Sequence, residues 1–224
     1  MQAHSGNPML QHQFENLDQQ REASTFGMWV FLVTEIMFFG GLFTAYVIYR
    51  QRFHGVFVDA SHMLNVTAGA INTAVLICSS LTMALAIWAS QVNKRKLIVF
   101  FLLLTILLGL TFLGIKAYEY AAKFEEHLVP GTDFHPETDK IPLAEQPEAE
   151  VFFSLYFCMT GLHALHMIIG ISLLGSLLLP AWKGRFNSEW NNTLECSGLY
   201  WHFVDIVWIF LFPLLYLVGL QHVH

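Results

Sequence analysis

The chain has 224 residues, of which 55% are hydrophobic and only 12% are charged. A soluble globular domain carries about 25% charged residues, so this deficit, together with 20 Phe and 6 Trp, indicates a lipid environment. The formal net charge is −6, and the basic cluster at residues 94–96 is too short to follow a nucleic-acid backbone, which argues against a nucleic-acid-binding protein.

Five stretches are long and apolar enough to cross a bilayer as helices, since about 20 apolar residues span its hydrocarbon core. Open strands in lipid would leave backbone groups unpaired, which excludes a sheet. The expected spans, in chain order, are 26–49, 64–92, 97–117, 151–182 and 196–220. The sequence therefore predicts an all-α integral membrane bundle of five transmembrane helices over residues 25–224.

The polar segment 1–24 precedes the first span and lacks the apolar run of a signal peptide, so we expect the first span to direct membrane insertion. Lys and Arg are enriched in cytoplasmic loops. They cluster at 94–96, between the second and third spans, and at 183–185, between the fourth and fifth. This pattern predicts a cytoplasmic N-terminus and an external C-terminus.

An acidic external loop is expected at about residues 121–150. This segment contains four prolines and eight acidic residues, which is typical of irregular, solvated chain. It is either a hydrophilic connector or a negative surface that attracts a basic partner.

Glu35 is the one acidic residue of the first span and lies near its middle. Its helical neighbours, such as Phe31 and Phe39, are apolar, so its partner must come from another helix or its carboxyl must be protonated. A neutral carboxyl that locks two helices together and a role in proton handling both fit this setting. Gly40-Gly41, further along the helix, would let a neighbouring backbone approach closely.

Histidines and acids recur in the last two spans, and their spacing by three or seven residues places them on one face of each helix. They are Thr160, His163 and His166 in the fourth span and Glu195, His202 and Asp205 in the fifth. Two histidines three residues apart rarely hold a metal or haem without a third ligand, so hydrogen bonding between helices is favoured. Together with Glu35, these histidines and acids are buried functional candidates, and we expect one internal polar cluster.

The sequence contains no nucleophile, phosphate-binding, zinc-protease or dinucleotide motif. His135-Pro136-Glu137 looks like a fragment of a haem-copper catalytic motif, but it lies in the polar loop, where it cannot hold a buried metal. Cys78, Cys158 and Cys196 lack zinc or redox spacing, and we expect buried, inert thiols. We therefore expect no catalytic residue, bound cofactor or metal ligand in this chain.

The chain resembles subunit III of the haem-copper oxidases, the cytochrome c oxidase family, over roughly residues 26–220. The motifs that carry this resemblance occur in order, at 26–39 (FGMWVFLVTEIMFF), 72–83, 109–120, 153–166 and 199–208 (LYWHFVDIVW). The family's buried glutamate corresponds to Glu35, and its acids and histidines in the last two spans correspond to His163, His166, Glu195, His202 and Asp205. The mitochondrial form has two further helices at its start, so the chain is similar to the five-helix bacterial form. Lys116 stands where the family more often has Gln.

The resemblance implies a non-catalytic accessory subunit of a proton-pumping cytochrome c oxidase, which reduces dioxygen to water in a bacterial inner membrane. Haem and copper would lie in the partner subunits I and II, cytochrome c would be the donor to the complex, and this chain would stabilise the catalytic subunit, support proton uptake and bind phospholipid. The two helices that wall the lipid cleft of the longer form are missing here, so another subunit would have to supply that wall. The setting of Glu35 favours cytochrome c over a quinol as donor.

Four alternatives remain open at the level of the sequence. Two lie within or beside the same superfamily, namely an accessory subunit of a quinol oxidase or of a nitric oxide reductase. A third is an independent proton or ion transporter, and a fourth is a membrane b-type cytochrome with His163, His166 or His202 as haem ligands.

Overall fold

The computed structural model describes residues 14, 16–131, 134–135, 141–184 and 192–217. These residues form α-helices and one short 3-10 helix, and none of them is in a strand. The elements are α1 (Leu17–Arg52), α2 (His54–His62), α3 (Val66–Gln91), α4 (Arg95–Glu125), η1 (Leu143–Glu145), α5 (Gln146–Trp182) and α6 (Asn192–Tyr216). Five of them, α1, α3, α4, α5 and α6, are long and apolar enough to cross a membrane, which confirms the predicted all-α fold with five spans.

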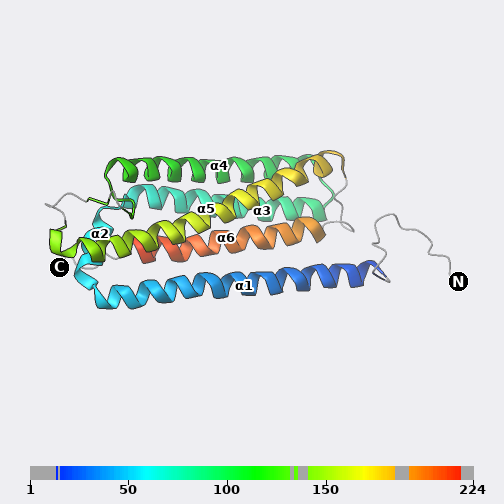
Figure 1. Ribbon diagram of the computed structural model, residues 1–224. Helices are drawn as coiled ribbons and strands as arrows, with labels where there is room; N and C mark the ends of the chain where they lie inside the picture. Colours follow the sequence, from blue (N-terminus) through cyan, green and yellow to red (C-terminus); the bar gives the residue numbers. More distant parts are fainter. Residues whose placement is uncertain (1–13, 15, 132–133, 136–140, 185–191, 218–224) are drawn as a thin grey trace.

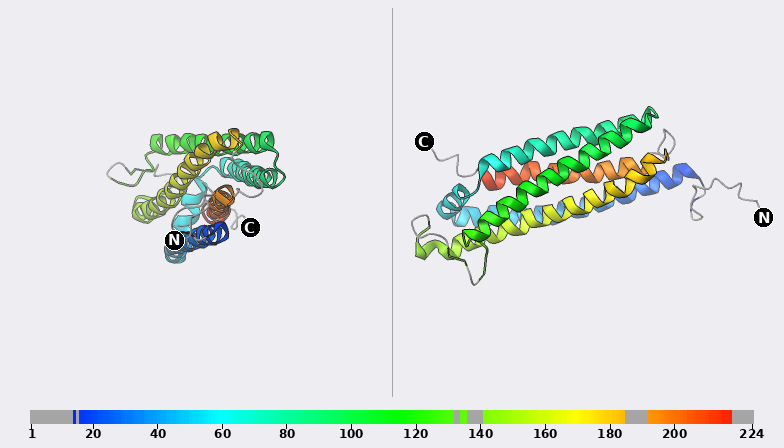
Figure 2. Two further views of the ribbon diagram at one scale, coloured as in Figure 1. Left: turned by 90° about the vertical axis from the view of Figure 1, so that its right-hand side faces the viewer. Right: turned by 90° about the horizontal axis from the view of Figure 1, so that it is seen from above.

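The five long helices lie side by side, with α6 in the middle of the assembly (Figure 1). α6 contacts α3, α5 and α1, and α4 closes the bundle by packing against α3 and α5. The end-on view in Figure 2 shows α1 on the outside of the bundle formed by the other four. The inside-to-outside orientation stays a prediction.

Several helices extend beyond the predicted spans. α1 begins at Leu17 because the Asn16 side chain caps it, accepting a hydrogen bond of 2.8 Å from the Gln19 backbone nitrogen. α4 continues to Glu125, about two turns past the predicted end at residue 117, and α5 begins at Gln146. α2 was not predicted, and it places Phe57 in the core.

The predicted acidic loop is consequently shorter and less solvated than expected. Leu128 and Ile141 are buried, and the Gly131 backbone nitrogen donates a hydrogen bond of 2.9 Å to Glu150. Residues 132–133 and 136–140, which include most of the His135-Pro136-Glu137 fragment, lie outside the described residues, as do residues 1–13 and 15 of the polar N-terminal segment.

The bundle has an apolar exterior and several polar residues inside. Large side chains such as Met37, Leu81 and Leu107 are more than half exposed, whereas Asn72 and Thr160 are fully buried. This is the pattern of a protein whose outer surface contacts lipid. The cysteines follow it: Cys78 and Cys158 are exposed and Cys196 is half-buried, so the expectation of buried thiols was wrong.

Trp201 of α6 is the main point of contact between the central helices. Its ring is fully buried, and its indole nitrogen donates to the Ser79 hydroxyl of α3 at 3.0 Å. The ring lies so close to Gly109 of α4 and Gly170 of α5 that a Cβ atom at either position would approach it to 2.9 and 3.0 Å. Glycine at these two positions thus makes room for the indole.

The glycines singled out in the sequence have a different setting. A Cβ atom at Gly40 or Gly41 would meet nothing within 4 Å, so no neighbouring backbone approaches them. The predicted close approach at this point of α1 was wrong.

Candidate functional site

Glu35 and His166 form an ion-pair or hydrogen-bond contact between α1 and α5. Nε2 of His166 lies 3.1 Å from Oε2 of Glu35, and the two side chains are 10% and 20% exposed. The sequence required a partner for Glu35 from another helix, and the structure identifies that partner as His166.

The hydrogen bonds of His166 determine where protons can lie. Nδ1 of His166 is 2.9 Å from the Leu162 carbonyl oxygen, which can only accept, so Nδ1 carries a proton. A neutral imidazole then has a bare Nε2, and the contact with Glu35 needs one further proton between the two groups. The proton lies either on the Glu35 carboxyl or on Nε2, so in both cases the pair is electrically neutral as a whole.

Aromatic rings surround this pair. The Phe39 ring centroid is 5.4 Å from that of His166, and the Tyr200 ring stacks on the imidazole at 6.4 Å. The Tyr200 hydroxyl donates to the His166 backbone oxygen at 3.1 Å. These contacts fix the imidazole and limit access of water to the shared proton.

His163 is not part of this contact. It is 1% exposed, neither ring nitrogen has a hydrogen-bond partner among the described residues, and its ring packs against Phe112 at 5.3 Å and Trp208 at 5.2 Å. Both histidines contact α6, but His163 packs against α4 on its other side, whereas His166 contacts α1.

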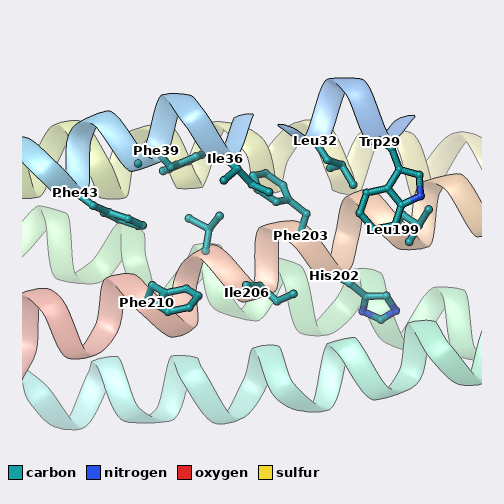
Figure 3. Close-up of a pocket in the computed structure, with 12 residues that line it drawn as sticks. Trp29, Leu32, Ile36, Phe39, Phe43, Leu199, His202, Phe203, Ile206 and Phe210 are labelled. Atoms are coloured by element: carbon teal, nitrogen blue, oxygen red, sulfur yellow. The ribbon is translucent and has the colours of Figure 1, made fainter. Parts of the chain in front are cut away.

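His202 and Asp205 face α3. Nδ1 of His202 lies 2.8 Å from the Ser80 hydroxyl, and Figure 3 shows the His202 ring on the side of α6 away from the labelled α1 residues. Asp205 is 3% exposed, and neither carboxyl oxygen has a hydrogen-bond partner among the described residues. Glu195 is half-buried in the first turn of α6, where a negative charge is favourable at the helix N-terminus.

The structure thus brings two of the six candidate residues, Glu35 and His166, into direct contact. The expectation of one internal cluster was wrong. Each helix has several neighbours, so side chains that share one face of a helix can still contact different neighbouring helices.

A second polar group, which was not predicted as a site, lies where α4, α5 and α6 meet. Lys116 and Glu119 form a salt bridge of 2.9 Å, and both are almost fully buried. The Lys116 ammonium also bonds to the hydroxyls of Tyr156 at 3.1 Å and Tyr216 at 2.9 Å. Both tyrosines donate to Oε1 of Glu119, at 3.0 and 2.6 Å. The ammonium also lies 5.3 Å from the Trp208 ring.

The spacing of the charged residues in the sequence could have predicted this group, but the predicted end of the third span was placed too early. Ending the third span at residue 117 assigned Glu119 to the loop. Continuing the helix places Lys116, Glu119 and Lys123 three and four residues apart and therefore on one face. The Lys at position 116, where the related family more often has Gln, matches a buried carboxylate one turn away.

An elongated apolar cavity separates parts of α1 and α6 (Figure 3). Its volume is about 440 Å³. Apart from His202 its lining is apolar, with Trp29, Leu32, Ile36, Phe39, Gly40 and Phe43 from α1 and Leu199, Phe203, Ile206, Val207 and Phe210 from α6. Such a lining suits a hydrocarbon chain and offers no group for a polar substrate.

Among the described residues, no three His, Cys, Asp or Glu side chains come together as a metal ion would require. The expectation of a metal-free chain stays a prediction. His163, whose ring nitrogens have no hydrogen-bond partner among the described residues, is 1% exposed and packs against the rings of Phe112 and Trp208.

Comparison with known proteins finds similarity to the family that the sequence motifs resemble. Residues 147–220 match the family model described as cytochrome c oxidase subunit III. Subunit 3 of the cytochrome bo(3) ubiquinol oxidase of Buchnera aphidicola is 28% identical over 202 residues, which are 90% of this chain and 97% of that protein. Probable quinol oxidase subunit 3 of Staphylococcus haemolyticus is 29% identical over 88% of this chain and 89% of its own length. The Staphylococcus aureus protein of the same name is 27% identical over 95% and 99%.

Proposed function

Because the chain is similar over most of its length to subunit III of haem-copper oxidases, we propose that it is a member of that family and a non-catalytic accessory subunit of a membrane oxidase that reduces dioxygen to water. The observation that carries this proposal is the Glu35–His166 contact, at the position that corresponds to the family's buried glutamate. Haem and copper would reside in the partner subunits I and II, and this chain would stabilise the catalytic subunit in a bacterial inner membrane.

The same contact supports a part in proton uptake. The pair holds one proton between two helices, and loss of that proton would leave two acceptors, Nε2 and a carboxylate oxygen, facing each other. Such a pair acts more readily as a fixed proton store near the catalytic subunit than as a free carrier.

The structure gives less support to an independent transporter or a cytochrome. The hydrogen bonds of the described residues do not join Glu35, Asp205 and the Lys116 group into one path through the bundle. His166 and His202 are already hydrogen-bonded, and His163 is enclosed.

The sequence and the named relatives favour different electron donors for the complex. The setting of Glu35 favours cytochrome c, whereas the relatives that match most of the chain are named quinol oxidases. We therefore propose a quinol as donor to the complex, with cytochrome c as the second candidate. Oxygen consumption by the complex, purified through a tag on this chain, separates them. Activity with ubiquinol or menaquinol alone supports the quinol, and activity with reduced cytochrome c supports the alternative.

Lipid binding is proposed at the apolar cavity between α1 and α6. Its lining supports a lipid tail, since it has the size and character of an acyl-chain site. Phospholipid analysis of the complex, with an Ile36→Trp variant that fills the cavity, tests this. The variant should carry less tightly bound lipid, and unchanged lipid content would place the lipid elsewhere.

The accessory role is tested by comparing the oxidase with and without this chain. We expect the enzyme that lacks it to consume oxygen at first at nearly the normal rate and then to lose activity faster during turnover. Immediate and complete loss of oxygen consumption in a correctly assembled enzyme would contradict the proposal.

A further inference from the structure

A groove on the outer surface of the bundle runs between α3 and α6. Its volume is about 440 Å³. Its lining is mostly apolar, with Leu76, Ile77, Leu81, Ala84, Ile206 and Ile209, and its polar groups are Ser80, His202 and Asp205. Leu81 and Ile206 flank it and are 61% and 51% exposed, so the groove faces the surroundings of the bundle.

Asp205 lies in the wall of this groove without a partner. Its side chain is 97% covered, and neither oxygen makes a hydrogen bond to a described residue. The Ser80 hydroxyl lies beside it and also bonds to Nδ1 of His202 at 2.8 Å, and its single proton can serve at most one of the two carboxyl oxygens. A buried carboxyl oxygen without a donor is costly in either protonation state, so a donor from outside this chain would complete the bonds of Asp205.

The depth of Asp205 decides which donor can reach it. It is 13 residues from the first and 11 from the last residue of α6, which places it about 20 and about 17 Å from the two helix ends. In a hydrocarbon core of about 30 Å this is near the centre, beyond the reach of lipid headgroups and of bulk water. Lipid tails carry no donor, whereas a side chain on another transmembrane helix can reach this depth.

We propose that the groove between α3 and α6 is the docking surface for a transmembrane helix of the haem-bearing oxidase subunit, which donates a hydrogen bond to Asp205. This inference rests on the proposed function. The donor is a hydroxyl, amide or cationic side chain near the middle of the partner helix.

The remaining lining supports a helix as the occupant. Ser80 and Ala84, one turn apart on α3, are small and allow a helix to approach closely. The exposed Leu81 and Ile206 supply apolar contacts on either side of the polar centre. The surface therefore combines packing with one specific bond, as helix contacts in membranes do.

Photo-crosslinking in the assembled complex tests the docking surface. A photoreactive phenylalanine derivative replaces Leu81 or Ile206 in the groove, or Leu107 on α4, which is 59% exposed and also near the middle of its helix. We expect cross-links to the haem-bearing subunit from Leu81 and Ile206 and none from Leu107. Cross-links from the groove to lipid alone, in a chain that still co-purifies with haem, would overturn the docking surface and leave the proposed function standing. A chain that never co-purifies with haem would overturn both.

Substitution of Asp205 tests the bond itself. Asp205→Leu should lower the amount of chain retained per haem after a detergent wash by about tenfold, since a hydrogen bond to a charged or strongly polar group is lost. Asp205→Asn keeps an acceptor oxygen and should retain more chain. The thermal unfolding of the isolated chain should not fall with Asp205→Leu, because no bond within the chain is removed. A loss of stability in the isolated chain with unchanged retention would show that Asp205 serves the fold and not a partner.

Discussion

Glu35 and Lys116 show two ways in which this bundle accommodates an ionisable side chain inside a membrane. Glu35 shares one proton with a histidine on another helix, which leaves the pair neutral. Lys116 forms a salt bridge with Glu119, and two tyrosine hydroxyls complete the bonds of both groups. In each case the charge is compensated inside the protein and not by lipid or water.

Substitutions of Glu35 should separate the hydrogen bond from the charge. Glu35→Gln should leave the free energy of unfolding nearly unchanged, because its amide N–H can donate to Nε2 of His166. Glu35→Leu should cost about 1–3 kcal/mol, since that nitrogen is left without a partner. Chemical or thermal unfolding of the purified chain in detergent measures both. Equal losses for the two variants would mean that the shared proton is not what stabilises the contact.

Removal of Lys116 should have a larger effect. Lys116→Met leaves the Glu119 carboxylate buried without its cation and should cost about 3–5 kcal/mol of unfolding free energy. Glu119→Gln in the same chain should recover much of this loss. The comparison is Lys123→Met, which should cost less, because its partner Glu126, just beyond the end of α4, is 45% exposed and water can solvate that carboxylate once the lysine is removed. Similar losses for Lys116→Met and Lys123→Met would contradict the account.

At the scale of the helices, Trp201 and the two glycines beside it determine how closely α4, α5 and α6 approach. The driving force is van der Waals packing, since lipid tails are as apolar as the side chains they would replace. The indole also ties α6 to α3 through Ser79, so one side chain contacts three other helices.

Gly109→Ala and Gly170→Ala should each cost about 1–3 kcal/mol, because the added methyl group meets the rigid indole ring. The matched control is Gly114→Ala, also in α4, where an added Cβ meets nothing within 4 Å. It should be neutral or stabilising by up to about 1 kcal/mol, because Ala favours the helix. Unfolding of the three variants in detergent gives the comparison, and a loss for Gly114→Ala equal to the others would show that the effect is not packing against Trp201.

The helices were largely predictable from the sequence, and the contacts between them were not. Long apolar runs determine the number of spans, because a segment in the hydrocarbon core must pair its own backbone groups and therefore forms a helix. Their ends are less certain, since polar residues such as Glu119 can still be helical, and this is why the Lys116 group was missed. The partner of Glu35 depends on which face of α5 turns toward α1, and no local pattern encodes that rotation.

At the scale of the whole molecule, two surface features of the bundle support the proposal that it is a subunit of a larger complex. α1 lies at its edge beside an apolar cavity, and the groove between α3 and α6 holds an acidic side chain without a partner. We propose that the first feature binds lipid and that the second binds another protein. The described residues contain no metal cluster that could perform redox chemistry.

Substitutions in the cavity between α1 and α6 and in the groove between α3 and α6 should therefore change lipid binding or retention in the complex more than they change the stability of the isolated chain. Filling the cavity with Ile36→Trp should change bound lipid, and Asp205→Leu should change retention in the complex. In the isolated chain the unfolding free energy should change by less than about 0.5 kcal/mol with Ile36→Trp, which alters an exposed residue, and should not fall with Asp205→Leu, which removes a buried polar group that lacks a full set of partners. A larger fall for both would mean that these surfaces belong to the fold of the chain itself.

Native mass spectrometry of the chain, tagged and extracted in mild detergent, tests the central claim most directly. We predict that the chain emerges in a complex with haem- and copper-bearing partners, and that its own mass on dissociation equals that of the polypeptide without haem or metal. A chain that emerges alone, or with haem attached to itself, would contradict the assignment as an accessory subunit of an oxidase.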